Sequence, residues 1–303
     1  MAFRAAEYER FQGERSTLPA WWPVLKATVH RGWANTWVRR LTLGSGIFAL
    51  VVTIVLYLLY KVMPEWRSLL QQFGEFAATT GAAEAEDFVV GENFYLGMLN
   101  LYTYPVLLPL AVLFGQDLVS ADLRANSLEA YFSRPLTPLG YLLGRTFAYV
   151  GFLLAATWLP LMWIWGFDAI SGPDGHYETI RKVPGSFFLA LTGVALTLAL
   201  VVQATTCLSR SSTWTTMGLV VLFLFSPAVA HILFEITGVH ATLALSLPED
   251  IHVLTRATLV LEPLPAEQDS PTTAGAMIVF GCLSLISLII LHQKVLNKKG
   301  AIG

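Results

Sequence analysis

Six long apolar runs without a charged side chain constrain the fold of this chain more than any other feature. A helix needs about 20 predominantly apolar residues to cross a hydrocarbon core of roughly 30 Å. Lipid offers the backbone no hydrogen-bonding partner, so such runs must be helical. Only 13% of the chain is charged, about half the share found in soluble domains. The sequence therefore predicts an all-α polytopic membrane protein, with spans at residues 41–60, 94–114, 146–167, 185–208, 214–234 and 274–291.

The distribution of basic residues predicts the orientation. With six spans, both termini share a side with the connection between spans 2 and 3 and the connection between spans 4 and 5. That side carries 14 of the 19 lysines and arginines, which leaves 5 for the other side. The positive-inside rule therefore predicts that both termini are cytoplasmic.

The segment before the first span, residues 1–40, is predicted to be a cytoplasmic N-terminus ahead of a six-span domain, residues 41–303. After Pro23, helical spacing places four apolar residues on one stripe, and basic residues lie largely away from it. This pattern indicates an amphipathic helix in the headgroup plane, and a cytosolic helix packed on another domain is the alternative. The stripe consists of Leu25, Val29, Trp33 and Trp37.

The connection at residues 236–273 contains four prolines and so cannot be one long helix. Short outer helices and partial re-entry into the membrane both stay open for it.

The connection between spans 2 and 3, residues 115–145, carries the strongest functional signal. It has a mixed charged face and a helical spacing of leucine and phenylalanine, followed by a break at Ser133–Pro135. Such a short helix has a surface suited to binding another protein, and the alternative is a solvated loop helix. The spaced apolar residues are Leu118, Leu123, Leu128 and Phe132.

This connection resembles the signature of type-2 ABC transporter permeases. In that family a glycine ends the second span, and an acidic–basic pair, a small–small–Leu turn, a Ser-x-Pro step and a Tyr-Leu-x-Gly-Lys motif follow. The chain departs from the family in separating its acidic and basic residues by Leu123, in having Asn where Gly is usual, and in replacing the lysine by Arg145. The matching residues are Gly115, Asp122 with Arg124, Asn126–Ser127–Leu128, Ser133 with Pro135, and Tyr141–Leu142 with Gly144–Arg145.

The resemblance implies a permease half of an export-type transporter in the bacterial plasma (inner) membrane. Its connection would include a coupling helix that docks on a cytoplasmic ABC ATPase, present in two copies, and the chain would face a second permease half, identical or paralogous. The chain has no Gly-x4-Gly-Lys-Ser/Thr phosphate loop, so ATP and Mg would bind the partner, and the chain itself would be no enzyme and hold no cofactor. Its other expected partner is membrane lipid, and none is nucleic acid. The residues expected to couple are Asp122, Arg124, Ser127, Leu128, Glu129, Phe132 and Pro135.

Two other functions stay open. A membrane anchor or scaffold for an ABC-type ATPase would need the same coupling surface. A secondary transporter is disfavoured, because none of the six predicted spans contains a charged residue and ion coupling commonly uses one.

Within the spans, neutral polar side chains are expected to bond across helices or, as a lesser alternative, to line a substrate route. The candidates for such lining are Asn100, Tyr102 and Tyr104. No spacing matches a metal-ligand motif, so no metal site is predicted, although His231, Glu235, Glu249, Asp250 and His252 lie near one another in sequence. Four prolines inside spans predict kinks, at Pro105, Pro109, Pro160 and Pro227.

Overall fold

The computed structural model describes residues 19–62, 91–125, 136–172, 175–209, 211–259 and 271–295, and these residues form helices without any strand. Six helical stretches are long and apolar enough to cross a membrane. The predicted all-α polytopic fold is therefore confirmed. In chain order, spans 1 to 6 are Thr36–Val62, Glu92–Arg124, Pro138–Ser171, His176–Ser209, Ser212–Thr237 and Thr273–Lys294.

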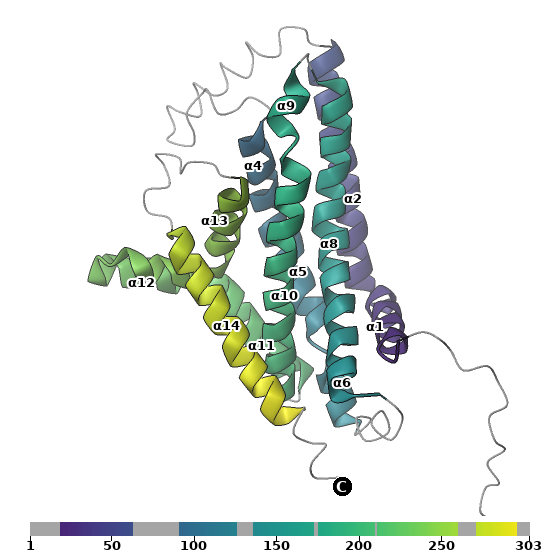
Figure 1. Ribbon diagram of the computed structural model, residues 1–303, viewed down its shortest axis with the longest axis vertical. Helices are drawn as coiled ribbons and strands as arrows, with labels where there is room; N and C mark the ends of the chain where they lie inside the picture. The colour runs from purple at the N-terminus through teal and green to yellow at the C-terminus, as the bar shows by residue number, and fades with distance from the viewer. Residues whose placement is uncertain are drawn as a thin grey trace, which may run out of the picture.

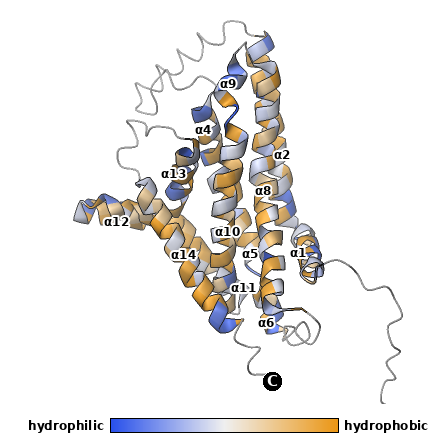
Figure 2. Ribbon diagram, in the orientation of Figure 1, coloured by the Kyte–Doolittle hydropathy of each residue, from blue (hydrophilic) through white to orange (hydrophobic). Residues whose placement is uncertain are grey.

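Every span is longer than predicted, at both ends. The prediction kept to apolar stretches without a charged residue, whereas the helices continue past these stretches, where hydrophilic residues gather (Figure 2). We call the end of the bundle that holds α6 (Ser120–Arg124) the α6 end, and the opposite end, which holds α9 (His176–Ile180), the α9 end (Figure 1). Helix α1 and the last turn of span 6 both lie toward the α6 end, as an even number of spans requires.

Spans 2, 3 and 4 form the centre of the bundle. Of their most apolar stretches, 67%, 56% and 50% is buried, against 17%, 22% and 22% for spans 1, 5 and 6. The three peripheral spans therefore present most of their apolar side chains to the surroundings, where lipid or another subunit would cover them.

The N-terminal amphipathic helix is α1 (Trp22–Ala34), which crosses the direction of spans 1 and 3 and is seen almost end-on in Figure 1. Span 1 follows at once as α2 (Thr36–Tyr57), extended by a π-helical turn, η1 (Leu58–Val62). Asn35 separates the two helices and caps α2, because its Oδ1 accepts from the backbone N–H of Trp37 at 3.0 Å. This cap explains why span 1 begins five residues before the predicted position 41.

Span 2 consists of α4 (Glu92–Tyr102), the π-helical turn η3 (Thr103–Leu107) and α5 (Leu108–Gly115). The predicted irregularities at Pro105 and Pro109 coincide with η3 and with the first turn of α5. Gly115 ends α5, as the motif predicts, and a Cβ there would lie 2.4 Å from Val202 Cγ1, so only glycine fits this approach to span 4.

Spans 3 and 4 are the longest continuous helices, α8 (Pro138–Ser171) and α10 (Val183–Ser209). Thr137 caps α8 by accepting from the backbone N–H of Gly140 at 3.0 Å. Pro160 lies inside α8 without ending it, so the kink predicted there does not break the helix.

Span 5 is not one straight helix. Helix α11 (Ser212–Val220) leads through the π-helical turn η4 (Val221–Phe225) into α12 (Ser226–Thr237), whose first turn contains Pro227 and which turns away from the bundle (Figure 1). The chain returns through η5 (His240–Leu245) and α13 (Leu247–Leu259) before α14 (Thr273–Lys294) forms span 6. The connection between spans 5 and 6 thus contains the short helices that the sequence allowed.

Candidate coupling site

A buried ion pair links α6 to span 3 at the α6 end of the bundle. The Asp122 carboxylate on α6 accepts from Arg145 Nη2 and, at 2.6 Å, from the Tyr141 hydroxyl. Arg145 also donates from Nη1 to Thr28 Oγ1 on α1 at 2.9 Å, and Arg31 on α1 lies 3.6 Å from Asp122. We call these five residues the α6 cluster; it joins α1, α6 and α8.

Local sequence places each member of the α6 cluster. Tyr141 and Arg145 are four residues apart on α8 and therefore share one face. Helix α1 can approach that face because Gly144 has no side chain, and a Cβ there would lie 2.8 Å from the carbonyl oxygen of Trp21. Gly144 therefore allows close packing of α1 on α8.

Because Asp122 and Arg145 are both buried, each charge needs the other as its partner. The side chains of Asp122 and Arg145 are 5% and 3% exposed. A charge removed from water must be paired and hydrogen-bonded, since an isolated one costs several kcal/mol. By contrast, Arg124 and Asp117 form an ion pair at 2.7 Å whose side chains are 48% and 43% exposed. The connection thus carries one ion pair that holds it in the bundle and one on its surface.

The predicted coupling residues do not all lie on one exposed surface. Asp122 was expected on an exposed mixed-charge edge but is buried, because Arg145 and Tyr141 surround it. Arg124 is exposed as expected, and Leu118, expected on an apolar edge, is buried in the bundle. The remaining predicted coupling residues, Ser127, Leu128, Glu129, Phe132 and Pro135, lie outside the described residues.

The polar residues of span 2 divide between surface and core. Tyr102 is buried and donates its hydroxyl to the backbone oxygen of Ser45 at 3.0 Å, which ties span 2 to span 1. Asn100 is exposed, and Tyr104 is also exposed and lines a cavity of about 340 Å³ between spans 2 and 5. We call this the lateral cavity. Its other lining residues are Leu108, Pro109, Val112, Leu113, Thr216, Val220, Phe223 and Leu224.

A second buried cluster, at the α9 end, escaped the sequence analysis. Asp168 near the end of α8 is fully buried, and its Oδ1 accepts from the Tyr60 hydroxyl at 2.5 Å. Its Oδ2 accepts from the Tyr95 hydroxyl at 2.6 Å and lies 3.1 Å from His176 Nε2. We call these four residues the α9 cluster; it joins spans 1, 2 and 3 to α9. Asp168 lies one residue beyond the predicted end of span 3, because the predicted spans were limited to stretches without a charged residue.

The connection between spans 5 and 6 contains a buried carboxyl, that of Asp250, to which no described residue donates a hydrogen bond. Asp250 on α13 is fully buried, and neither oxygen has a hydrogen-bond partner among the residues that the structure describes. Burial, together with the neighbouring charge of Glu249, raises the pKa of Asp250 to about 8, so it is neutral at pH 7. Burial and the nearby Arg256 lower the pKa of His252 to about 4.

The grouping of acidic and histidine residues around α12 and α13 yields one ion pair. Nε2 of His231 on α12 lies 3.0 Å from Glu249 Oε1 on α13. Within the described ranges, no group of three or more His, Cys, Asp or Glu side chains is placed to hold a metal ion.

The chain matches no family model and no curated protein.

Proposed function

We propose that this chain is the membrane-spanning permease subunit of an ATP-binding cassette exporter, in which a separate ATPase drives substrate movement. The α6 cluster is the observation that carries the proposal. It fixes the start of the connection between spans 2 and 3 to α1 and to span 3 through a buried ion pair. A force applied to this connection would therefore be transmitted to those helices instead of being absorbed by a loose loop.

In this proposal the α6 end faces the cytoplasm of a bacterial cell. The ATPase would dock on the connection at residues 115–145, where Arg124 is exposed and where the sequence places Leu128 and Phe132. Two ATPases and two permease halves would form the working complex. The apolar, little-buried surfaces of spans 1, 5 and 6 offer room for the second half.

The lateral cavity supports an apolar or amphipathic cargo over an ion. Its lining is apolar except for Tyr104 and Thr216, and a site of this kind offers no charge to compensate an ion.

The α6 cluster is also compatible with the second candidate function, a membrane anchor for an ABC-type ATPase. An anchor needs an equally firm attachment of the connection between spans 2 and 3 to the bundle. A secondary transporter has less support, although Asp168 is a buried acid near the end of a span. Both of its oxygens accept hydrogen bonds from protein groups, which leaves them less available to a transported ion.

The test is reconstitution with the ATPase that co-purifies with the chain. Truncating an apolar anchor of a protein interface costs about 2 kcal/mol or more, so Leu128→Ala and Phe132→Ala should each weaken ATPase binding roughly 30-fold. Glu84→Ala, on the side predicted to be outside, is the control and should bind as the wild type does. ATP-dependent export by the wild type would distinguish a permease from an anchor. Full ATPase binding by both variants would refute the docking site.

A further inference from the structure

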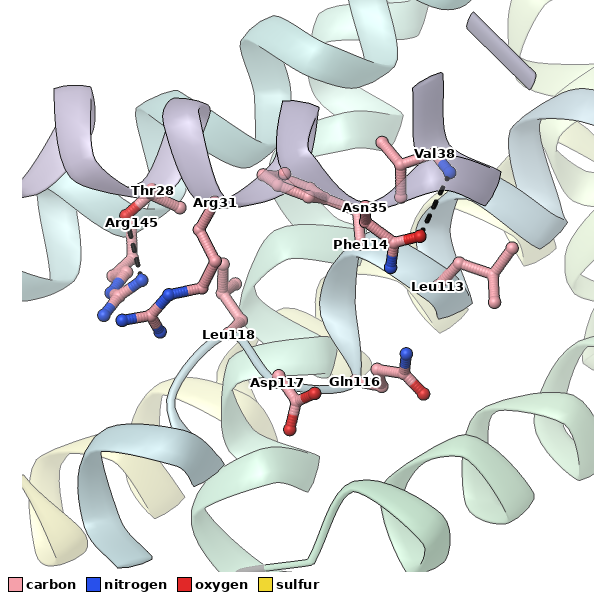
Figure 3. Close-up of a pocket in the computed structure, with 11 residues that line it drawn as sticks. Thr28, Arg31, Asn35, Val38, Leu113, Phe114, Gln116, Asp117, Leu118 and Arg145 are labelled. Atoms are coloured by element: carbon pink, nitrogen blue, oxygen red, sulfur yellow. Dashed lines mark hydrogen bonds between the residues drawn. The ribbon is translucent and has the colours of Figure 1, made fainter. Parts of the chain in front are cut away.

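A cavity of about 270 Å³ with a mixed polar and apolar lining lies between α1 and the α6 end of span 2 (Figure 3). We call it the α1 cavity. Such a volume is many times the roughly 30 Å³ that one water molecule occupies in the liquid. Its walls come from α1, the start of span 1, the end of span 2 and Arg145 of span 3. The residues used below are Arg31, Asn35, Leu113, Gln116, Asp117 and Arg145.

Asn35, Gln116 and Arg145 bring hydrogen-bond donors to the α1 cavity. Asn35 uses its Oδ1 to cap α2, and in Figure 3 its amide nitrogen points away from that bond, toward the side on which Asp117 and Gln116 lie. Gln116 uses its Oε1 to accept from Thr216 at 2.8 Å, which leaves its amide N–H groups available. Arg145 is 3% exposed, lines the α1 cavity, and its Nε has no acceptor among the described residues.

The charges around the α1 cavity leave a positive balance. Asp117 is paired with Arg124 at 2.7 Å, and Asp122 is paired with Arg145. Arg31 lies 3.6 Å from Asp122, too far for a hydrogen bond, and its side chain is 48% exposed. The lining itself thus contains two guanidinium groups, those of Arg31 and Arg145, and one carboxylate, that of Asp117. A site with surplus donors and one surplus positive charge suits an anion whose oxygens accept several hydrogen bonds, and a phosphate group is such an anion.

The surroundings of the α1 cavity indicate where the phosphate comes from. Helix α1 exposes Trp22 and Trp33 together with basic residues, and the first turn of α2 exposes Trp37, a composition typical of the headgroup region of a membrane. The α1 cavity and the lateral cavity both use Leu113 as a wall, so a chamber that contains charged and amide groups adjoins one that is almost wholly apolar. A phospholipid has this same division between a phosphate and acyl chains.

We propose that the α1 cavity binds the phosphate group of a phospholipid headgroup in the leaflet that holds α1, with the acyl chains directed toward the lateral cavity. Arg31, Asn35 and Arg145 hold the phosphate oxygens. The α1 cavity shares Arg31 and Arg145 with the α6 cluster, but none of the residues predicted to couple to the ATPase lines it, so either proposal can fail without the other.

The test is native mass spectrometry of the full chain, purified in detergent and stripped of lipid, with short-chain phosphatidylglycerol as the probe. Asn35→Asp keeps the acceptor that caps α2, because Asp and Asn cap equally well, but it removes the amide donor and adds a negative charge. Arg31→Gln removes one cation. A hydrogen bond to a charged group contributes about 1.5–3 kcal/mol, so each variant should weaken binding about tenfold or more.

The control is Arg39→Gln, which removes an equal charge from an exposed position on α2 that does not line the α1 cavity. It should bind phosphatidylglycerol as the wild type does. An equal loss in Arg39→Gln would show diffuse attraction to the surface and overturn the proposal, as would wild-type binding by Asn35→Asp and Arg31→Gln.

Two further probes separate the sources of the phosphate. Diacylglycerol with the same chains lacks the phosphate and should bind at least tenfold more weakly than phosphatidylglycerol; equal binding would overturn phosphate recognition. Inorganic phosphate should bind more weakly than the lipid, because it gains nothing from the lateral cavity. If it binds as tightly and responds equally to Asn35→Asp, the ligand is a free phosphate and the lipid assignment is wrong.

Discussion

The buried pair between Asp122 and Arg145 can be tested by removing each charge alone and then both together. Asp122→Ala leaves a guanidinium that is 3% exposed without its carboxylate and also deprives the Tyr141 hydroxyl of its acceptor. Breaking a buried pair from one side typically costs about 3–5 kcal/mol. We expect that loss in the free energy of unfolding for Asp122→Ala, and a similar loss for Arg145→Met.

The double variant Asp122→Ala/Arg145→Met should be more stable than the sum of the two single losses predicts, by about 2 kcal/mol or more. It buries no unpaired charge, and replacing a whole buried pair by apolar groups is often close to neutral. The assay is denaturant unfolding of the detergent-solubilised chain, followed by tryptophan fluorescence, as a double-mutant cycle.

The exposed pair of Asp117 and Arg124 is the matched control, since it has the same chemistry on the same connection. Its side chains are 43% and 48% exposed, so each truncation should cost less than about 1 kcal/mol and the effect should fade in high salt. The interpretation of the α6 cluster is refuted if Asp122→Ala costs no more than Asp117→Ala, or if the losses simply add in the double variant.

Three further predictions concern other parts of the chain. Burial raises the pKa of Asp250 to about 8, so near neutral pH the folded chain holds a proton that the unfolded chain has already released. Above about pH 6.5, where His252 is neutral in both the folded and the unfolded chain, the free energy of unfolding, measured by denaturation, should fall by about 1.4 kcal/mol per pH unit as the pH rises toward 8 and level off above it. Asp250→Asn should remove this fall. Tyr95→Phe removes one of the hydrogen bonds to the buried Asp168 carboxylate and should lower the free energy of unfolding by about 1.5–3 kcal/mol, measured by denaturation, whereas Tyr104→Phe, on an exposed side chain, should change it little. In a background without Cys207 and Cys282, a single cysteine at position 84 should be labelled from outside the cell, whereas one at position 126 should be labelled only after permeabilisation. Labelling of position 126 from outside would contradict the proposed orientation.

Features encoded within one stretch of sequence could be predicted. The absence of charge over a span length identified all six spans, and Gly115 marked the end of α5. Pro23 lies in the first turn of α1, as expected of a proline near a helix start. Gln203 was expected to bond across helices, and its amide donates to Thr146 on α8 at 2.8 Å.

Features that join distant parts of the chain could not be predicted. Asp122 and Arg145 lie in separate helices, and Thr28 reaches Arg145 from a third helix. Asp168 appeared to mark where span 3 leaves the membrane, and nothing near it in sequence shows that Tyr60 and Tyr95 converge on it. From the sequence alone, a charged residue next to an apolar run is predicted to be exposed to water, and only the packing of the other helices shows that it is buried.

Span 3 has its two flanking charges buried, and this has a mechanical consequence. Arg145 and Asp168 are 23 residues apart on α8 (168 minus 145), which corresponds to about 35 Å along a helix, close to the roughly 30 Å of a hydrocarbon core. Arg145 fixes one end to α1 and α6, and Asp168 fixes the other end to spans 1 and 2. Pro160 lies between them without interrupting the helix. Under the proposed function, a displacement of α6 by an ATPase would therefore move α8 as one body and reach the α9 end without passing through a flexible joint.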